Sequence, residues 1–161
     1  IKGFGYLILA FNHVNRFVPW SIFNFNKRKI DLSLAEVDKL GENGKEFEAY
    51  IAAIYRAQGL NAKTTTELKE DKDMPEEVLE NSGQGEQGVD VIVFLPEKQT
   101  HENGTEFDAL LIQCKQYSSS VSNKAVQEIY GAIPMYAKHF KRKFLPMVIT
   151  NNYYTASAKD L

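Results

Sequence analysis

Three polar residues stand at the ends of two apolar runs, at a spacing that suits a metal-dependent phosphodiesterase site. Asp90 begins the β-branched run DVIVFLP, and Gln113 and Lys115 lie near the end of the run ALLIQCKQY. Side chains alternate between the two faces of a strand, so Gln113 and Lys115 share one face. Residues 103–104 between the runs are Asn-Gly, the commonest tight-hairpin dipeptide, and a hairpin would bring Asp90 within reach of the other two.

These residue types could hold a divalent cation and activate a water molecule. Mg²⁺ prefers hard oxygen ligands, so the Asp90 carboxylate and the Gln113 amide oxygen could bind it, and Mn²⁺ can substitute. A bound cation lowers the pKa of water and polarises phosphorus, while the Lys115 ammonium could position the water and offset developing charge. An Asp at a strand start and a Lys at a strand end also occur as solvated strand termini, so these residues alone leave a purely structural interpretation open.

Five segments between residues 44 and 161 together resemble the catalytic domain of Mrr-type restriction endonucleases. In order along the chain they are GKEFEAYIAAIYRAQGLNAK, GQGEQGVDVIV, LLIQCKQYS, VQEIYGAI and PMVITNNYYTASAKDL. That family is part of the PD-(D/E)xK nuclease superfamily, in a branch where Gln replaces the third acidic residue. The resemblance implies an α/β, restriction-endonuclease-like core with a mixed central β-sheet flanked by helices, and magnesium-dependent cleavage of double-stranded DNA.

The resemblance also assigns roles to individual residues. Asp90 matches the metal-binding Asp, and Gln113 and Lys115 match the Gln-x-Lys pair. Glu48 matches the acidic residue of the family's first helix, which would reach the metal through water, and the backbone carbonyl of Cys114 matches a further metal ligand. A neutral amide attracts a cation less strongly than a carboxylate, so the sequence predicts weak metal binding until DNA adds charge, and tighter binding in a Gln113→Glu variant.

Two parts of the chain are expected: an aromatic-rich extension at 1–40 and an Mrr-like nuclease domain at 41–161, which stops short of the strand and helix that usually close such domains. The approach to Asp90 carries Glu86, where the family often has another acid. The uncharged stretch 3–15 is too short to span a membrane. We expect residues 1–30 to pack on the nuclease core or on a dimer partner, with contact to a membrane surface as the alternative.

Charge is unevenly distributed along the 161 residues, which suit a single modest domain. The net charge of −2 divides into +3 over residues 1–65, −10 over 66–108 and +5 over 109–161. The acidic block holds the predicted metal site, and the basic segments could bind DNA phosphates. Solvated surface without a partner explains both patterns as well. The single cysteine excludes an internal disulfide and indicates a reducing, cytoplasmic compartment, with membrane association through residues 1–30 left open.

A first helix is predicted from Asn43, which would form a capping box with Glu46, to a stop at Gly59. Glu48 lies in its first turn, where an acid also simply favours the helix dipole. The apolar stripe of this helix is Phe47, Tyr50, Ile51, Ile54 and Tyr55. The run 60–66 has strand character, and the charged, glycine-punctuated segment after it predicts a long loop or lid.

The last third of the chain predicts a helix, a strand and a short final helix. Ser122 or Asn123 would cap the first of these, whose apolar positions are Ala125, Val126, Ile129, Tyr130 and Ile133. Pro134 should bend or end that helix, because proline removes a backbone donor and clashes with the preceding turn. The run 144–150 is predicted to be a strand, and Thr155 would cap the final helix.

Candidate DNA contacts cluster after Lys115, in a loop and a helix start that could meet phosphates. They are Tyr117, Ser118, Ser119, Ser120, Lys124 and Gln127, each of which also fits ordinary surface.

The sequence and the resemblance together predict a magnesium-dependent DNA endonuclease of a restriction system. A homodimer is expected, since cutting both antiparallel strands with one site per chain calls for two sites related by a two-fold axis. A non-catalytic DNA-binding or assembly module on the same fold, and a repair or junction-resolving nuclease, are the alternatives. The three histidines are far apart and lack i+3 or i+4 partners, so zinc is not expected.

Overall fold

A four-stranded mixed sheet forms the centre of the computed structural model, which describes residues 40, 44–76, 88–101, 103–116 and 120–159. The predicted N-terminal extension therefore lies outside the described residues, apart from Leu40. The strands follow the order β1-β2-β3-β4 in the sheet. They are β1 (Asn61–Thr64), β2 (Val91–Thr100), β3 (Glu106–Lys115) and β4 (Phe144–Thr150).

Pairing in the sheet is antiparallel between β1 and β2 and between β2 and β3, but parallel between β3 and β4. A parallel pair needs a crossover connection, and α6 supplies it between β3 and β4. The helices are α3 (Lys45–Ala57), α4 (Thr65–Glu70), α6 (Asn123–Phe140) and α7 (Ala156–Lys159). The predicted α/β class, with a mixed sheet flanked by helices, is confirmed.

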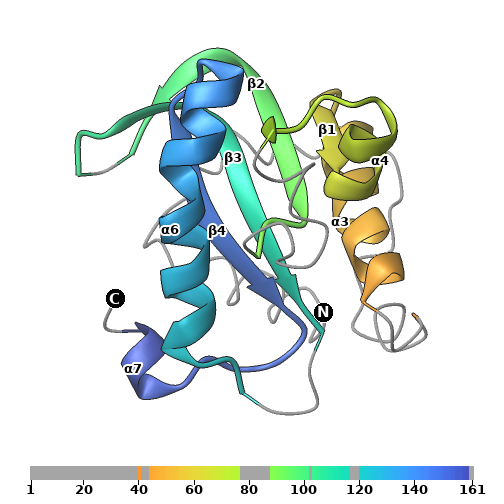
Figure 1. The fold of residues 1–161 in the computed structure, drawn as a ribbon. Helices are drawn as coiled ribbons and strands as arrows, with labels where there is room; N and C mark the ends of the chain where they lie inside the picture. Colours follow the sequence, from red (N-terminus) through yellow and green to blue (C-terminus); the bar gives the residue numbers. More distant parts are fainter. Residues whose placement is uncertain (1–39, 41–43, 77–87, 102, 117–119, 160–161) are drawn as a thin grey trace.

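Helices α3 and α6 cover opposite faces of the sheet, and Figure 1 shows the strands between α6 on the left and α3 on the right. Strand residues alternate between the two cores as a pleat requires: Val91 and Val93 pack on the α3 side, and Ile92 packs on the α6 side. All seven residues of β4 are buried. Burial on both faces specifies the register, because a slip by one residue would exchange the faces of every side chain.

The first helix ends as the sequence predicts but begins differently. Gly59 has φ 83°, and the amides of Gly59 and Leu60 donate to the carbonyls of Arg56 and Tyr55 at 2.9 and 3.2 Å. At the other end, Gly44 is the N-cap, with φ 74° and no side-chain capping bond. The predicted capping box between Asn43 and Glu46 is therefore wrong: the chain turns at a glycine, which adopts a positive φ readily.

Helix α4 occupies the start of the segment for which a loop was predicted, so that part of the prediction is wrong. Thr64 and Glu67 form a capping box: the Glu67 amide donates to Thr64 Oγ1 at 3.2 Å, and the Thr64 amide donates to Glu67 Oε2 at 2.8 Å. Leu68 and Met74 then anchor the segment in the core beneath α6. Residues 77–87, the remainder of the predicted lid, lie outside the described residues.

Helix α6 runs through Pro134 to Phe140, so of the two predicted effects of this proline, a bend or an end, the end is wrong. Its buried stripe also differs from prediction, because Tyr130 is 46% exposed and Ile133 is half-buried. Ala125, Val126, Ile129, Ala132 and Tyr136 form the buried stripe, and the last two continue the packing beyond the proline. Ser122 occupies the N-cap position, as predicted, but its side chain makes no capping hydrogen bond. Within the described ranges, no helix combines the length and apolar content that a membrane span requires.

Candidate functional site

The carboxylate of Asp90 is attached to the end of β3 by backbone hydrogen bonds. The Cys114 amide donates to Asp90 Oδ2 at 2.6 Å, and the Asp90 amide donates to the Ile112 carbonyl at 2.8 Å. The adjacent pair Val91–Ile112 is in register within the β2–β3 hairpin, so Asp90 lies beside the Gln113–Cys114 peptide. The prediction that a hairpin brings Asp90 to the Gln-x-Lys segment is confirmed.

The junction between β1 and α4 holds Asp90 from the other side. The Thr65 amide donates to the Asp90 carbonyl at 2.9 Å, and Thr65 Oγ1 lies 3.5 Å from the same oxygen. Thr65 is almost fully buried, so these bonds are shielded from water. The capped start of α4, which sequence patterning missed, thus positions the backbone of the central carboxylate.

Glu48 and Asp90 line one surface pocket of about 390 Å³. Glu48 comes from the first turn of α3 and is half-buried, as its place at the edge of the apolar stripe implies. The other lining residues are Lys45, Thr65, Thr66, Lys69 and Glu70. The structure therefore brings two of the predicted site residues into a single pocket, where their carboxylates present the hard oxygen ligands that magnesium prefers.

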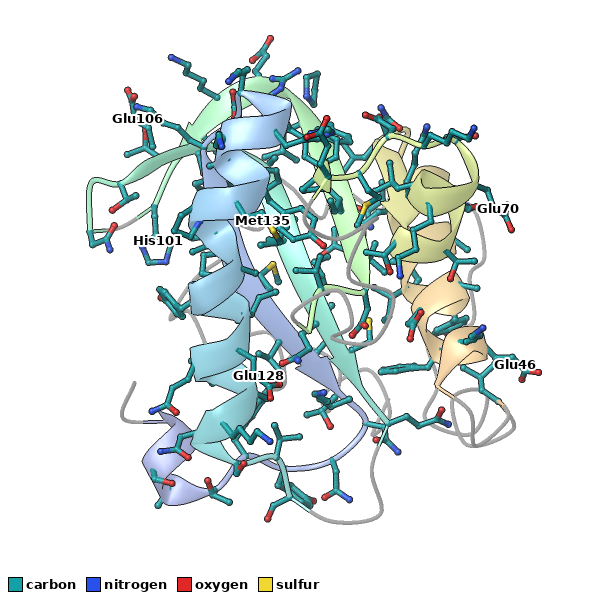
Figure 2. All side chains as sticks on the ribbon, in the orientation of Figure 1. Glu46, Glu70, His101, Glu106, Glu128 and Met135 are labelled. Atoms are coloured by element: carbon teal, nitrogen blue, oxygen red, sulfur yellow. The ribbon has the colours of Figure 1, made fainter. Side chains whose placement is uncertain are left out.

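Gln113 is fully buried and does not line that pocket. Its Nε2 donates to Oε2 of Glu128, on α6, at 3.0 Å, so the side chain lies on the α6 face of the sheet. Figure 2 shows Glu128 on the side of α6 that faces the sheet. Oε1 of Gln113 is buried and has no hydrogen-bond partner among the described residues.

Sequence analysis missed Glu128 as part of this arrangement. The signal was present in the segment VQEIYGAI, where an acid lies directly beside the buried Ile129 on a helix predicted to cover the sheet. An acid at the margin of a buried helix face is more often solvated, so the pattern alone gave no reason to select it. Gly88 was also missed as a packing residue: a Cβ there would lie 2.1 Å from Gln113 Nε2.

Cys114 packs against the core on the α3 side, opposite Gln113, as the strand alternation predicts. Burial raises the pKa of its thiol well above the ordinary value, the negative charges of Asp90 and Glu48 raise it further, and Lys115 partly opposes them. The thiol therefore remains protonated, which agrees with a core residue rather than a nucleophile.

The candidate DNA contacts are only partly described. Tyr117, Ser118 and Ser119 lie outside the described residues. Lys124 and Gln127 are exposed on the first turns of α6, and Lys124 Nζ lies 3.7 Å from Oε1 of Glu128. Lys124 is thereby connected, through Glu128, to Gln113.

The donor set fits a hard divalent cation in type. Three carboxylates, those of Glu48, Glu70 and Asp90, line the pocket, and a buried amide oxygen that has no donor among the described residues belongs to the strand beside Asp90. Buried polar atoms normally find a partner, and an oxygen left without one suits a cation or water. Among the described residues no group of three or more His, Cys, Asp or Glu could hold a metal ion. Because the Gln113 amide is neutral, these ligands carry less negative charge than an all-carboxylate site would. Glu86 lies outside the described ranges.

A family model supports the fold. The model of the Mrr catalytic domain, described as a restriction endonuclease, matches residues 40–161. No curated protein and no solved structure matches the chain. The matched range includes every described helix and strand together with Glu48, Asp90, Gln113 and Lys115. The chain therefore belongs to the restriction endonuclease family of the Mrr catalytic domain, and its described part is a nuclease domain with the expected restriction-endonuclease-like fold.

Proposed function

We propose that this domain is a magnesium-dependent endodeoxyribonuclease that hydrolyses phosphodiester bonds of double-stranded DNA in a restriction-type defence system. One observation supports this most directly: the Asp90 carboxylate is fixed by the Cys114 amide and shares a pocket with Glu48. Membership of the restriction endonuclease family makes DNA the expected substrate.

Four groups would hold the cation: the carboxylates of Asp90 and Glu48, the amide oxygen of Gln113 and the backbone carbonyl of Cys114. When bound, magnesium lowers the pKa of water and stabilises negative charge on the phosphate. Lys115 follows directly on the same strand, where its ammonium would orient the attacking water and offset charge as it develops on the phosphate. The Asp90 carboxylate is already oriented before substrate binds, because the Cys114 amide donates to it and the Asp90 backbone is hydrogen-bonded to Ile112 and Thr65.

The charges of the pocket explain why a cation would be needed. Glu48, Glu70 and Asp90 line it together with Lys45 and Lys69, so acids outnumber bases. DNA phosphates would be repelled by this excess unless a divalent cation reversed the sign of the local field. The excess of acidic lining residues therefore supports the proposed dependence on a metal.

A non-catalytic DNA-binding or assembly module is the second candidate. It is favoured by the finding that no cluster of three potential His, Cys, Asp or Glu ligands occurs in the described part of the chain. Such a module would bind DNA without cutting it, in magnesium or in manganese.

Nicking of a supercoiled plasmid distinguishes the two functions. The wild-type protein should convert the plasmid in Mg²⁺ or Mn²⁺ but not in EDTA, and Asp90→Ala and Lys115→Ala should each abolish conversion. Glu97→Ala and Lys98→Ala are matched controls, because both residues are exposed at the far end of β2. DNA binding without any cleavage by the wild-type protein, in either cation, would support the non-catalytic module and overturn the proposal.

A further inference from the structure

We infer that Glu128 is a positioning residue, which fixes the amide of Gln113 so that its oxygen is available to a divalent cation. The inference rests on the proposed function, since it concerns how one of the predicted ligands is presented. Its starting point is the 3.0 Å contact between Gln113 Nε2 and Glu128 Oε2, which joins β3 to α6 across 15 residues of sequence.

The chemistry of the two groups decides which way the amide faces. An ionised carboxylate only accepts hydrogen bonds, whereas the two ends of an amide differ: NH₂ donates and C=O accepts. Glu128 therefore selects the orientation in which NH₂ faces α6, and the oxygen must lie on the other side of the amide carbon. The observed arrangement matches this requirement, because Oε1 is the end of Gln113 that lacks a donor among the described residues.

Packing at Gly88 limits the alternatives. Gly88 has φ 75°, and a Cβ at this position would lie 2.1 Å from Gln113 Nε2 and 3.3 Å from the Glu128 Cβ. The backbone of Gly88 thus lies directly against the Gln113–Glu128 pair, and Gln113 has no solvent-exposed surface into which it could move. Packing against Gly88 confines the Gln113 amide, and the hydrogen bond to the Glu128 carboxylate determines which of the two remaining amide orientations is adopted.

Glu128 also has a charged neighbour on the solvent side. Lys124, one helical turn earlier, lies 3.7 Å from Oε1 of Glu128, while Oε2 accepts from Gln113. An i, i+4 pair of opposite charge on a helix favours this side-chain conformation. The two carboxylate oxygens therefore have different partners, one at the helix surface and one on the strand.

The same contact explains why position 113 carries an amide. A carboxylate there has no N–H to donate to Glu128, so the 3.0 Å hydrogen bond would be replaced by two acceptor oxygens at about the same separation. The sequence alone predicts tighter metal binding for Gln113→Glu. With Glu128 beside it, we instead expect the single variant to bind metal less well than the wild-type protein.

Exchanging the two residues tests the inference. In Gln113→Glu/Glu128→Gln the amide on α6 can donate to the carboxylate on β3, so the hydrogen bond returns with its direction reversed and the total charge unchanged. Mn²⁺ affinity of the DNA-free protein, measured by calorimetry, is the readout, with thermal unfolding to confirm folding. Glu128→Ala should weaken Mn²⁺ binding by roughly 10–100-fold, the range found for groups that orient metal ligands. Gln113→Glu should also weaken it, and the double variant should bind at least ten times more tightly than Gln113→Glu.

Glu97→Ala, an exposed carboxylate at the far end of β2, is the matched control and should keep wild-type affinity. If Glu128→Ala fails to fold, Gln113→Glu and the double variant still decide the matter. The positioning role would be overturned if folded Glu128→Ala kept wild-type Mn²⁺ affinity, or if the double variant bound Mn²⁺ no more tightly than Gln113→Glu. Plasmid cleavage by the wild-type protein would still leave the proposed function intact. A wild-type protein that neither binds Mn²⁺ nor cuts DNA would overturn both.

Discussion

The Cys114 amide donates a 2.6 Å hydrogen bond to Oδ2 of Asp90, and this contact joins the two strands of the candidate site through a backbone group. A backbone donor does not depend on the type of side chain at position 114, so the thiol is not needed for it. Fixing one carboxylate oxygen also orients the other, because the group is planar. The charge of Asp90 and its role as an acceptor can therefore be separated by mutation.

Asp90→Asn should keep the fold but lose metal-dependent cleavage. Its side-chain oxygen can still accept from Cys114, whereas the negative charge is gone. We expect activity to fall by more than the roughly 10–100-fold typical of residues that only orient a ligand, with little change in the unfolding midpoint. Asp90→Ala should lose activity and stability together, since it leaves the Cys114 amide without its acceptor. Cleavage by Asp90→Asn at the wild-type rate would show that the Asp90 carboxylate does not bind the metal.

Gly88→Ala should destabilise the protein well beyond the cost of its backbone conformation. The added Cβ would lie 2.1 Å from Gln113 Nε2, so the Gln113–Glu128 pair must move. Overpacking of this kind costs about 1–3 kcal/mol in unfolding free energy, in addition to roughly 1 kcal/mol for a non-glycine residue at positive φ. Urea denaturation measures the total.

Gly104→Ala is the control for Gly88→Ala. Gly104 has φ 84° in the β2–β3 turn, and nothing lies within 4 Å of a Cβ built there. It should lose only the backbone contribution. Equal losses of stability in the two variants would show that the residues around Gly88 adjust without cost.

Local signals predicted most of the fold. The Asn-Gly turn, the stop at Gly59 and the strand Phe144–Thr150 each depend on residues within a few positions of one another, and all three are found in the structure. The same reasoning failed where tertiary packing outweighed a local preference. Helix α6 continues through Pro134, where one lost backbone bond is outweighed by the buried stripe on both sides.

The proximity of Asp90 to the Gln-x-Lys segment within the sheet could be predicted from the sequence, whereas the contact between the sheet and helix α6 could not. The predicted hairpin brings Asp90 near the Gln-x-Lys segment, but its place beside the Gln113–Cys114 peptide also depends on a register shift between Phe94 and Gln99, which was not predicted. The contact of Gln113 with Glu128 depends on the rotation of α6 over the sheet, which an apolar stripe specifies only approximately. That rotation also decides that Tyr136 rather than Tyr130 is buried, and no local pattern distinguishes these outcomes.

Glu67 should make stability depend on pH. Burial raises the pKa of its carboxyl, but hydrogen bonds from Thr64 and Arg56 outweigh burial, and the pKa lies below its ordinary value of 4.5. A lowered folded-state pKa means that the carboxylate stabilises the fold above pH 4.5 and that this stability is lost as the pH falls through the folded-state pKa. Glu67→Gln should thus be less stable than the wild-type protein at pH 7, by under about 1 kcal/mol because the pair is partly exposed. The difference should shrink below pH 4.5 in urea titrations; a difference that stays constant with pH would contradict the assignment.

The protein should act as a homodimer, because one site per chain has to reach two antiparallel DNA strands. Residues 1–30 are the predicted contact, on the strength of their aromatic content, and they lie outside the described residues. Light scattering should give a dimer mass for the full chain and a weakened dimer after deletion of residues 1–30. A monomer that still makes double-strand breaks in one encounter would argue against this arrangement.

Metal and DNA should bind cooperatively, since the neutral Gln113 leaves the pocket with two predicted carboxylate ligands and a DNA phosphate can add further negative charge. Lys115→Ala, which keeps all proposed ligands and should be inactive, allows both equilibria to be measured without cleavage. We expect a short duplex to tighten Mg²⁺ binding by roughly 5–150-fold, the usual range of coupling between two sites, and Mg²⁺ to tighten DNA binding by the same factor. Asp90→Ala in the same background should lose most of this coupling. If the DNA affinity of Lys115→Ala were the same with Mg²⁺ and with EDTA, the phosphate would not share a cation with Asp90.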